Sequence, residues 1–157
     1  MGLNEIVGNV SFGEGCIINP TCSIICEKKD ENFRIVFGDF NVIEERAVIM
    51  FRPSSEKDNV MRIGSYNTFG IKSYVLNTQV GDGNVFEARS EVKDGVFGNY
   101  NMVGSDTRIA KKNIGSHYRI FAPGIMKEVD LVDEAKLREN MRELYAATKH
   151  LHSKEAK

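Results

Sequence analysis

A seventeen-residue period runs through the second half of this 157-residue chain. An apolar residue followed by glycine recurs at that interval, and further apolar residues follow it after six and twelve positions. The resulting triplets are Ile63, Phe69 and Val75; Val80, Phe86 and Val92; Phe97, Val103 and Ile109; and Ile114, Ile120 and Met126. A fixed period of this kind marks a solenoid, in which each unit buries its apolar side only by stacking on its neighbours.

Earlier triplets continue the pattern if insertions are allowed between the coils. The extra residues are polar and fall near 28–34 and 52–61, which is typical of loops that leave a solenoid at a corner. The pattern therefore predicts an all-β solenoid of about six coils over residues 1–127, with Ile6 in a frayed first coil. The two earlier triplets are Phe12, Ile18 and Ile24, and then Phe37, Ile43 and Ile49.

The corners of the predicted coils have residue types suited to tight turns. Glycine follows the first apolar residue of each triplet, and both glycine and asparagine tolerate the left-handed backbone conformation that a corner needs. A recurring asparagine predicts a column of side-chain amides joined along the stack. This column contains Asn41, Asn67, Asn84 and Asn101, and Tyr118 interrupts it. The matching second corner has small residues, Ala47, Ser73, Ser90 and Thr107, and Cys16 and Cys22 take the two slots of the first coil.

The composition has no strong charge bias. The chain has 21 basic and 22 acidic residues, a net charge of -1 and no long basic run, which argues against binding nucleic acid or an anionic membrane. No apolar stretch reaches the roughly 20 residues of a membrane span, and the first residues do not resemble a signal peptide. The three cysteines are expected to be buried, reduced thiols of a cytoplasmic protein.

The apolar spacing changes to three and four residues in the tail. This change predicts an amphipathic helix over 128–152 and a disordered tail over 153–157. A helix of ~35 Å suits the ~29 Å height of six stacked coils, so we expect the helix to lie along the solenoid. It is expected to pack through Leu137, Met141, Leu144, Tyr145 and Leu151 against Val42, Tyr66, Val85 and Met102 on the second face.

The outward positions of the third face are apolar only in its N-terminal half. An exposed apolar patch of this kind usually binds a protein partner. Two alternatives stay open: the polar loops fold over the patch, or the helix takes this face instead of the second one. The candidate partner-binding residues are Ile25, Val48, Met50, Tyr74 and Leu76, and farther along the face they give way to Glu91, Lys93 and Arg108.

No cluster of residues predicts catalysis, a metal site or a cofactor site. A hexapeptide-repeat acyltransferase needs a histidine base, and a gamma-class carbonic anhydrase needs three zinc-binding coil histidines. Only His117 lies in the repeat, and His150 and His152 point to different sides of the predicted helix. The cysteines have no fourth ligand nearby. The carboxylates Glu44, Glu45, Asp82 and Glu87 take outward or corner positions, where solvated charge is normal.

Three coils resemble the dynactin subunit 6 family. Residues 37–49, which contain Ile43-Glu44-Glu45, resemble one coil of that family, and the polar loop at 52–61 falls where the family has a loop. Residues 61–69 resemble its Ile-Gly-x-x-Asn-x-Phe coil, and residues 80–87 resemble its Gly-Asp-x-Asn coil. The order of the coils, the loop and the closing helix agrees over roughly residues 5–150.

This resemblance implies a left-handed parallel β-helix with a non-enzymatic role in the pointed-end complex of dynactin, the activator of cytoplasmic dynein. It implies pairing with dynactin subunit 5, close to subunit 4 and an actin-related protein. The implied setting is cytoplasmic, cytoskeleton-associated and concerned with microtubule-based transport, without a cofactor or a small-molecule substrate. The alternative is a hexapeptide-repeat acyltransferase or a carbonic-anhydrase-like homotrimer, with a site near His117.

Overall fold

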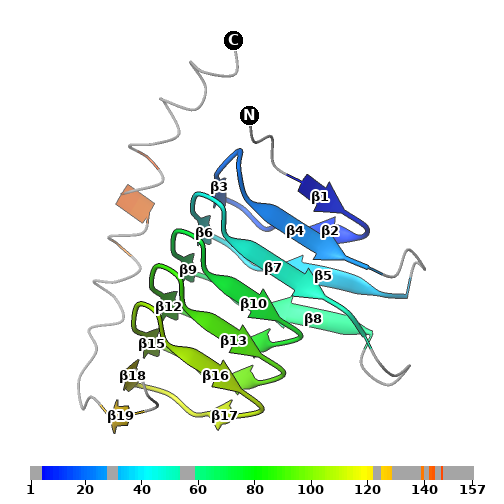
Figure 1. The fold of residues 1–157 in the computed structure, drawn as a ribbon. Coiled ribbons are helices and arrows are strands. Elements are labelled where there is room, and N and C mark those ends of the chain that lie inside the picture. The colour runs from blue at the N-terminus through cyan, green and yellow to red at the C-terminus, as the bar shows by residue number, and fades with distance from the viewer. Residues whose placement is uncertain are drawn as a thin grey trace.

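The chain winds through three sheets that form the faces of a prism (Figure 1). The computed structural model describes residues 5–27, 32–53, 59–121 and 125–128, together with Glu139, Arg142, Glu143 and Ala146. Each turn adds one strand to each sheet in succession, and the strands of successive turns pair in parallel. The fold is therefore the all-β solenoid that the period predicts.

The three sheets take their strands in strict rotation. Sheet A, which faces the viewer in Figure 1, contains β1 (Glu5–Val7), β4 (Ser23–Cys26), β7 (Val48–Phe51), β10 (Tyr74–Leu76), β13 (Glu91–Lys93) and β16 (Arg108–Ala110). Sheet B contains β2 (Val10–Ser11), β5 (Arg34–Phe37), β8 (Val60–Ile63), β11 (Gln79–Val80), β14 (Val96–Phe97) and β17 (Asn113–Ile114). Sheet C contains β3 (Ile17–Ile18), β6 (Val42–Ile43), β9 (Thr68–Phe69), β12 (Val85–Phe86), β15 (Met102–Val103), β18 (Tyr118–Phe121) and β19 (Ile125–Glu128).

The inward side chains stack in the predicted register. In sheet A, Val75 pairs with Ile49 on one side and with Val92 on the other. Full burial of an aliphatic or aromatic side chain stabilises the fold by roughly 1.5–3 kcal/mol. A line of rings runs through the interior, with neighbouring centroids 5.1 to 6.4 Å apart; its members are Phe37, Phe69, Phe86 and Phe97.

The last coil does not close as the period predicts. The pattern places Met126 in the third parallel strand of the last coil, but β19 pairs antiparallel with β18, so that Met126 lies opposite Ile120 in sheet C. This prediction was wrong. The intervening sequence, 122–124, reads Ala-Pro-Gly, and Pro and Gly are typical of a chain reversal, which competes with the hexapeptide period. At the N-terminal side, Ile6 pairs with Ile24 and is 42% exposed, as a frayed coil requires.

The left-handed backbone conformation occurs one residue before the predicted positions. The corner asparagines do not adopt it; instead the residue that precedes each of them has a positive φ, for example 62° at Tyr66 and 58° at Tyr100. The second corner behaves in the same way, with 58° at Arg89, which precedes Ser90. The prediction assigned this conformation to Gly and Asn, which tolerate it best. Gly83 and Asn77 do adopt it, but so do aromatic and charged residues such as Tyr66, Arg89 and Asp106.

The asparagine column forms as predicted. The Oδ1 atom of Asn67 accepts the backbone N–H of Asn84, and that of Asn84 accepts the backbone N–H of Asn101 at 3.0 Å. Each Nδ2 group also donates to a glycine carbonyl of the next coil, as Asn84 does to Gly98 at 2.9 Å. The column ends where the Tyr118 N–H donates to Asn101 at 2.8 Å.

The recurring glycines are needed because the coils approach closely. A Cβ atom on Gly64 would lie 2.6 Å from the carbonyl oxygen of Gly81, and one on Gly81 would lie 2.4 Å from that of Gly98. Gly83 combines both requirements, because its φ is +69° and a Cβ atom there would lie 2.4 Å from the Tyr100 ring. Close backbone approach, more than a special φ, therefore explains the glycine after the first apolar residue in the coils before the last one.

The repeat assigns inward slots to Cys16 and Cys22, and none to Cys26. Cys22 and Cys26 are fully buried, and Cys16 is half-buried with its Sγ atom 3.3 Å from the carbonyl oxygen of Gly38. Burial raises the pKa of the Cys22 thiol to about 11. All three are free thiols, as the sequence predicts.

The C-terminal segment is helical at Glu139, Arg142, Glu143 and Ala146. The residues predicted to form its apolar face, Leu137, Met141, Leu144, Tyr145 and Leu151, lie outside the described residues, as does the predicted tail at 153–157. So do most of the two predicted loops, although β5 and β8 begin at Arg34 and Val60, inside the predicted loop ranges.

Candidate protein-binding site

The outer face of sheet A brings the five predicted partner-binding residues together. One column across the strands contains Ile25, Met50 and Leu76, and the next contains Val48 and Tyr74. All five are half-buried. The Tyr74 hydroxyl donates to the Met50 sulfur at 4.0 Å, so the two columns are in contact. We call these five residues the apolar patch.

Charged residues continue both columns toward the C-terminal end of sheet A. Lys93 pairs with Leu76 in the ladder, and Glu91 pairs with Tyr74. The Nζ atom of Lys93 lies 2.8 Å from Glu91 and 5.6 Å from the centroid of the Tyr74 ring. The hydrogen bond to Glu91 and its negative charge raise the pKa of Lys93. The apolar patch is therefore bordered by an ion pair on this side.

A second ion pair borders the apolar patch at the corner between sheets A and B. Arg52 donates through Nε and a terminal nitrogen to both oxygens of Glu27, each at 2.8 Å. The same terminal nitrogen lies 3.7 Å from the Met50 sulfur. Because a bidentate pair has a fixed geometry, it orders this edge of the patch more than a single contact does.

The corner between sheets B and C contains stacked aromatic rings. Phe40 and Tyr66 stack with centroids 5.5 Å apart, and Arg142 of the C-terminal helix lies 5.8 Å from both centroids. Arg142 also donates to the Tyr66 hydroxyl at 2.9 and 3.2 Å. One described helical residue therefore contacts Tyr66, while the predicted apolar packing against Val42 and the residues beyond it stays a prediction.

The remaining outward residues of the predicted helix dock are in sheet C. Val42 is 8% exposed, and Val85 and Met102 are half-buried. The Arg142 contact was not predicted from the sequence, because a basic residue on the exposed side of a helix gives no signal of what it will contact.

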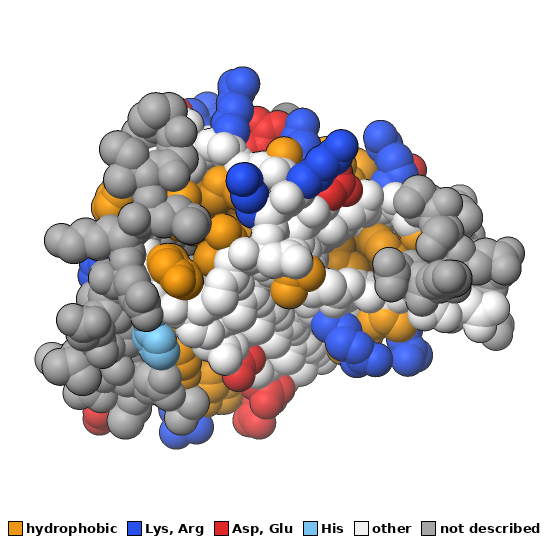
Figure 2. Space-filling model, turned by 90° about the horizontal axis from the view of Figure 1, so that it is seen from below, with side chains coloured by type: hydrophobic (Ala, Val, Ile, Leu, Met, Phe, Trp, Pro, Cys, Tyr) orange, Lys and Arg blue, Asp and Glu red, His pale blue; other side chains and the backbone are white. Residues whose placement is uncertain are grey.

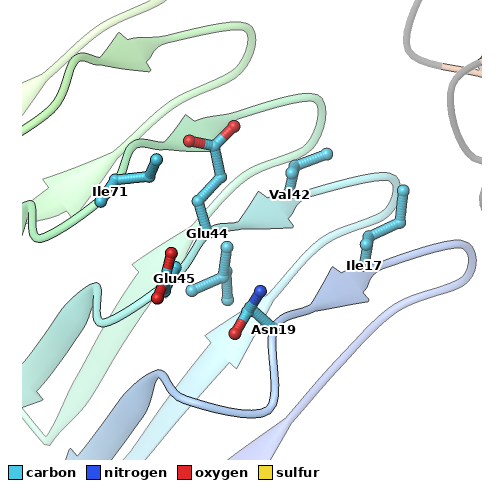
Figure 3. Close-up of a pocket in the computed structure, with 7 residues that line it drawn as sticks. Ile17, Asn19, Val42, Glu44, Glu45 and Ile71 are labelled. Atoms are coloured by element: carbon cyan, nitrogen blue, oxygen red, sulfur yellow. The ribbon is translucent and has the colours of Figure 1, made fainter.

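A shallow hollow opens at the junction of sheet C with the next corner (Figure 3). Its volume is about 300 Å³. Glu44 and Glu45 lie beside apolar side chains there, and Ile71 is 43% exposed. The other lining residues are Ile17, Asn19, Val42 and Ile43. Among the described lining residues, Asn19 is the one polar side chain besides the two carboxylates.

The described residues show no arrangement suited to metal chemistry. Among them, no group of three or more His, Cys, Asp and Glu side chains lies close enough to hold a metal ion. His117 lies at an aromatic corner of the last coil, where its ring stacks on Tyr100 with centroids 5.8 Å apart. Asp82 has a structural role, because its Oδ1 atom accepts the backbone N–H of Ser65 at 2.7 Å. In the part of the chain that the structure describes, no helical segment has the length and hydropathy of a membrane span.

Comparison with known proteins supports the resemblance seen in the sequence. No protein-family model matches the chain. Dynactin subunit 6 of Nematostella vectensis is 34% identical over 96 residues, covering 56% of this chain and 50% of that protein. Dynactin subunit 6 of Xenopus tropicalis is 31% identical over 96 residues (57% and 46%), and that of Danio rerio is 30% identical over 97 residues (57% and 48%). The chain spans about half the length of these curated relatives.

Solved structures show the same fold. LpxA from Acinetobacter baumannii gives a TM-score of 0.52 at 17% identity, covering 79% of this chain and 69% of that chain. The UDP-N-acetylglucosamine O-acyltransferase LpxA from Moraxella catarrhalis gives 0.50 at 21% identity, covering 83% and 60%. At these identities the likeness shows the fold alone, which is the predicted left-handed parallel β-helix. The chain is thus a β-helix protein that is similar in sequence to dynactin subunit 6 over more than half of its length.

Proposed function

We propose that this chain is a non-enzymatic structural and adaptor subunit of the dynactin complex. The observation that carries the proposal is its sequence similarity to dynactin subunit 6 from three animals. In this proposal the chain occupies the pointed end, pairs with dynactin subunit 5, and lies close to subunit 4 and an actin-related protein. It is cytoplasmic and cytoskeleton-associated, supports dynein-driven cargo transport along microtubules, and needs no cofactor.

The apolar patch on sheet A is the proposed partner-binding surface. Half-buried residues on an outer face combine a solvent-facing surface with a fixed conformation, which favours docking. Large aromatic and methionine side chains such as Tyr74 and Met50 are typical anchors of protein interfaces. The ordered ion pairs at the borders of the patch provide the polar rim that such interfaces have.

Affinity purification of the tagged chain from its native cell, followed by mass spectrometry, tests this proposal. We expect recovery of a second β-helix protein, an actin-related protein and other dynactin subunits. Met50→Glu and Tyr74→Glu place a charge in the patch and should reduce this recovery at least tenfold. Val96→Glu is the matched control, because Val96 is 46% exposed but lies on sheet B.

The enzyme alternative makes the opposite prediction. Recovery of the chain alone, as a homotrimer by light scattering, would overturn the proposal and favour a hexapeptide-repeat enzyme. An assay of acetyl transfer and of CO₂ hydration, repeated with His117→Ala, would then test that alternative. The stacking of His117 on Tyr100 gives this histidine a structural role in either case.

A further inference from the structure

The cationic end of sheet A has an unbalanced charge. Glu91 accepts from both Lys93, at 2.8 Å, and Arg108, at 3.3 Å, so one carboxylate serves two cations and the group has a net charge of +1. The Nε atom of Arg108 lies 3.3 Å from Glu91, and 84% of the Arg108 side chain is exposed. The terminal nitrogens of Arg108, which are the donors suited to bidentate binding of a carboxylate, therefore remain accessible.

A hollow lies between these two cations. It has a volume of about 250 Å³ and is lined by Glu91, Lys93, Arg108, Ile109 and Ala110. Ala110 pairs with Lys93 in the ladder, and its small side chain leaves space where the strands before it have larger ones. Seen from below, the end of the molecule that has the last coil, Lys and Arg side chains gather along the upper side, the side of sheet A, with acidic side chains among them (Figure 2).

The hollow and the apolar patch belong to one continuous surface. Met50, Leu76, Lys93 and Ala110 follow one another across the four strands of one column. Neighbouring strands lie about 4.8 Å apart, so Leu76 and Ala110 are separated by roughly 10 Å. A partner that covers the apolar patch therefore reaches the hollow with the same surface.

We propose that the partner presents an apolar side chain to the patch and an aspartate or glutamate, roughly 10 Å away, to the hollow between Lys93 and Arg108. This inference rests on the proposed function and specifies the chemistry of the partner. The carboxylate takes the accessible donors of Arg108 and offsets the excess charge of the group. An exposed ion pair contributes little affinity on its own, so burial of the apolar patch supplies most of the affinity and the carboxylate supplies orientation and specificity. A free anion lacks the apolar part and is not the ligand.

A carbodiimide that joins an amine to a carboxylate without a spacer tests the proposal directly. The dynactin complex is purified through a tagged Glu91→Gln chain, which lacks the carboxylate 2.8 Å from Lys93, and is treated with this reagent and digested. We expect a crosslinked peptide in which Lys93 is joined to an Asp or Glu of a second dynactin subunit. Lys93→Arg is the matched control, because it keeps the positive charge but removes the reactive amine, and the crosslink should disappear while recovery of the subunit remains.

Two further variants separate a charge effect from a structural one. Arg108→Ala should lower recovery of the partner about fivefold, and Glu91→Gln should raise it, because it releases both cations for the partner's carboxylate. If these substitutions disrupted the fold, both variants would recover less of the partner. Opposite effects therefore report the charge. Arg62→Ala removes an exposed cation on sheet B, outside this face, and it should change nothing.

The outcomes distinguish this inference from the proposed function. Recovery of the dynactin subunits with no crosslink from Lys93 to another subunit would overturn the carboxylate proposal and leave the proposed function standing. Failure to recover any dynactin subunit with the wild-type chain would overturn the proposed function, and this inference with it.

Discussion

The side-chain oxygen of Asn67 accepts the backbone N–H of Asn84 at 2.7 Å, so a side chain of one coil completes the hydrogen bonding of the next. The relationship repeats from Asn41 to Asn101 along one corner of the solenoid. Both side chains are fully buried. A buried polar group that loses its partner costs roughly 1–3 kcal/mol, so the column should be among the most sensitive features of the fold.

Replacing Asn84 with alanine should lower the free energy of unfolding by roughly 2–4 kcal/mol. The substitution leaves the Asn101 N–H and the Gly98 carbonyl without their partners inside the protein. Urea denaturation followed by circular dichroism measures the change. Asn113→Ala on the exposed edge of sheet B is the control and should cost less than about 0.5 kcal/mol. Equal losses in the two variants would contradict a special role for the column.

Gly83→Ala should destabilise the protein by about 2 kcal/mol. The added Cβ atom meets the Tyr100 ring, and the residue has a left-handed backbone conformation. Gly115→Ala is the matched control, because its nearest contact would be an ordinary 3.5 Å from the Tyr118 ring. Thermal unfolding of both variants measures the difference. A midpoint for Gly83→Ala as high as that of Gly115→Ala would show that the corner relaxes without cost.

Ser90→Ala should leave the protein equally stable or stabilise it by up to about 1 kcal/mol. Among the described residues, the Ser90 hydroxyl is buried without a hydrogen-bond partner, and Ala47 already occupies the equivalent slot of an earlier coil. Removing an unsatisfied buried hydroxyl removes its desolvation penalty. Denaturant unfolding would show the effect as a higher midpoint. A clear loss of stability would indicate that a water molecule binds this hydroxyl.

Alkaline pH should destabilise the protein partly through Cys22. Its pKa is raised from 9.0 in the unfolded chain to about 11 in the folded protein, because burial disfavours the thiolate. The contribution to stability is therefore fully present below pH 9 and is lost as the pH rises toward 11. The loss should be on the order of 1–2 kcal/mol at about pH 10.5.

The Cys22→Ala variant isolates this contribution. Other groups that titrate at alkaline pH are common to both proteins, so the difference in their pH dependence reports Cys22 alone. We expect unfolding experiments at about pH 8 and about pH 10.5 to show a smaller decline in the variant. An identical decline in the two proteins would mean that the Cys22 thiol ionises as readily in the folded protein as in the unfolded chain.

Arg142 and Tyr66 should be energetically coupled. The guanidinium group lies over the Tyr66 ring and donates to its hydroxyl, and a contact of this kind at an exposed site contributes about 0.5–1 kcal/mol. A double-mutant cycle with Arg142→Ala and Tyr66→Leu, measured by denaturant unfolding, gives the coupling energy. A second cycle, with Glu143→Ala in place of Arg142→Ala, is the control and should give no coupling energy. A coupling of zero for Arg142 would argue against docking of the helix at this corner.

Much of the fold could be predicted because the coils repeat. The spacing of apolar residues identified the inward positions, and the structure confirms this for residues such as Val75 and Val80. The outward residues of sheet A followed from the same register, which is why the apolar patch was located correctly on one face. The function of that patch stays a prediction, since periodicity identifies a surface and not what binds it.

Three features could not be predicted because they depend on contacts between coils or with the end of the chain. The antiparallel pairing of β19 with β18 replaces the parallel strand that the repeat predicts, although the apolar spacing continues as far as Met126. The Arg142 contact depends on where the helix lies. The hollow beside Ala110 depends on five residues of β13 and β16 that the strand ladder places together.

The sequence by itself determined the solenoid, its register, the asparagine column and the buried cysteines, because a strict period leaves each side chain a single environment that its neighbours repeat. Tertiary structure alone decided which corner residues adopt a positive φ, such as Tyr66 and Arg89. It also decided that Lys93 and Arg108 share the carboxylate of Glu91. These outcomes depend on how closely one coil packs against the next. The conformational preferences of individual residues do not determine that packing.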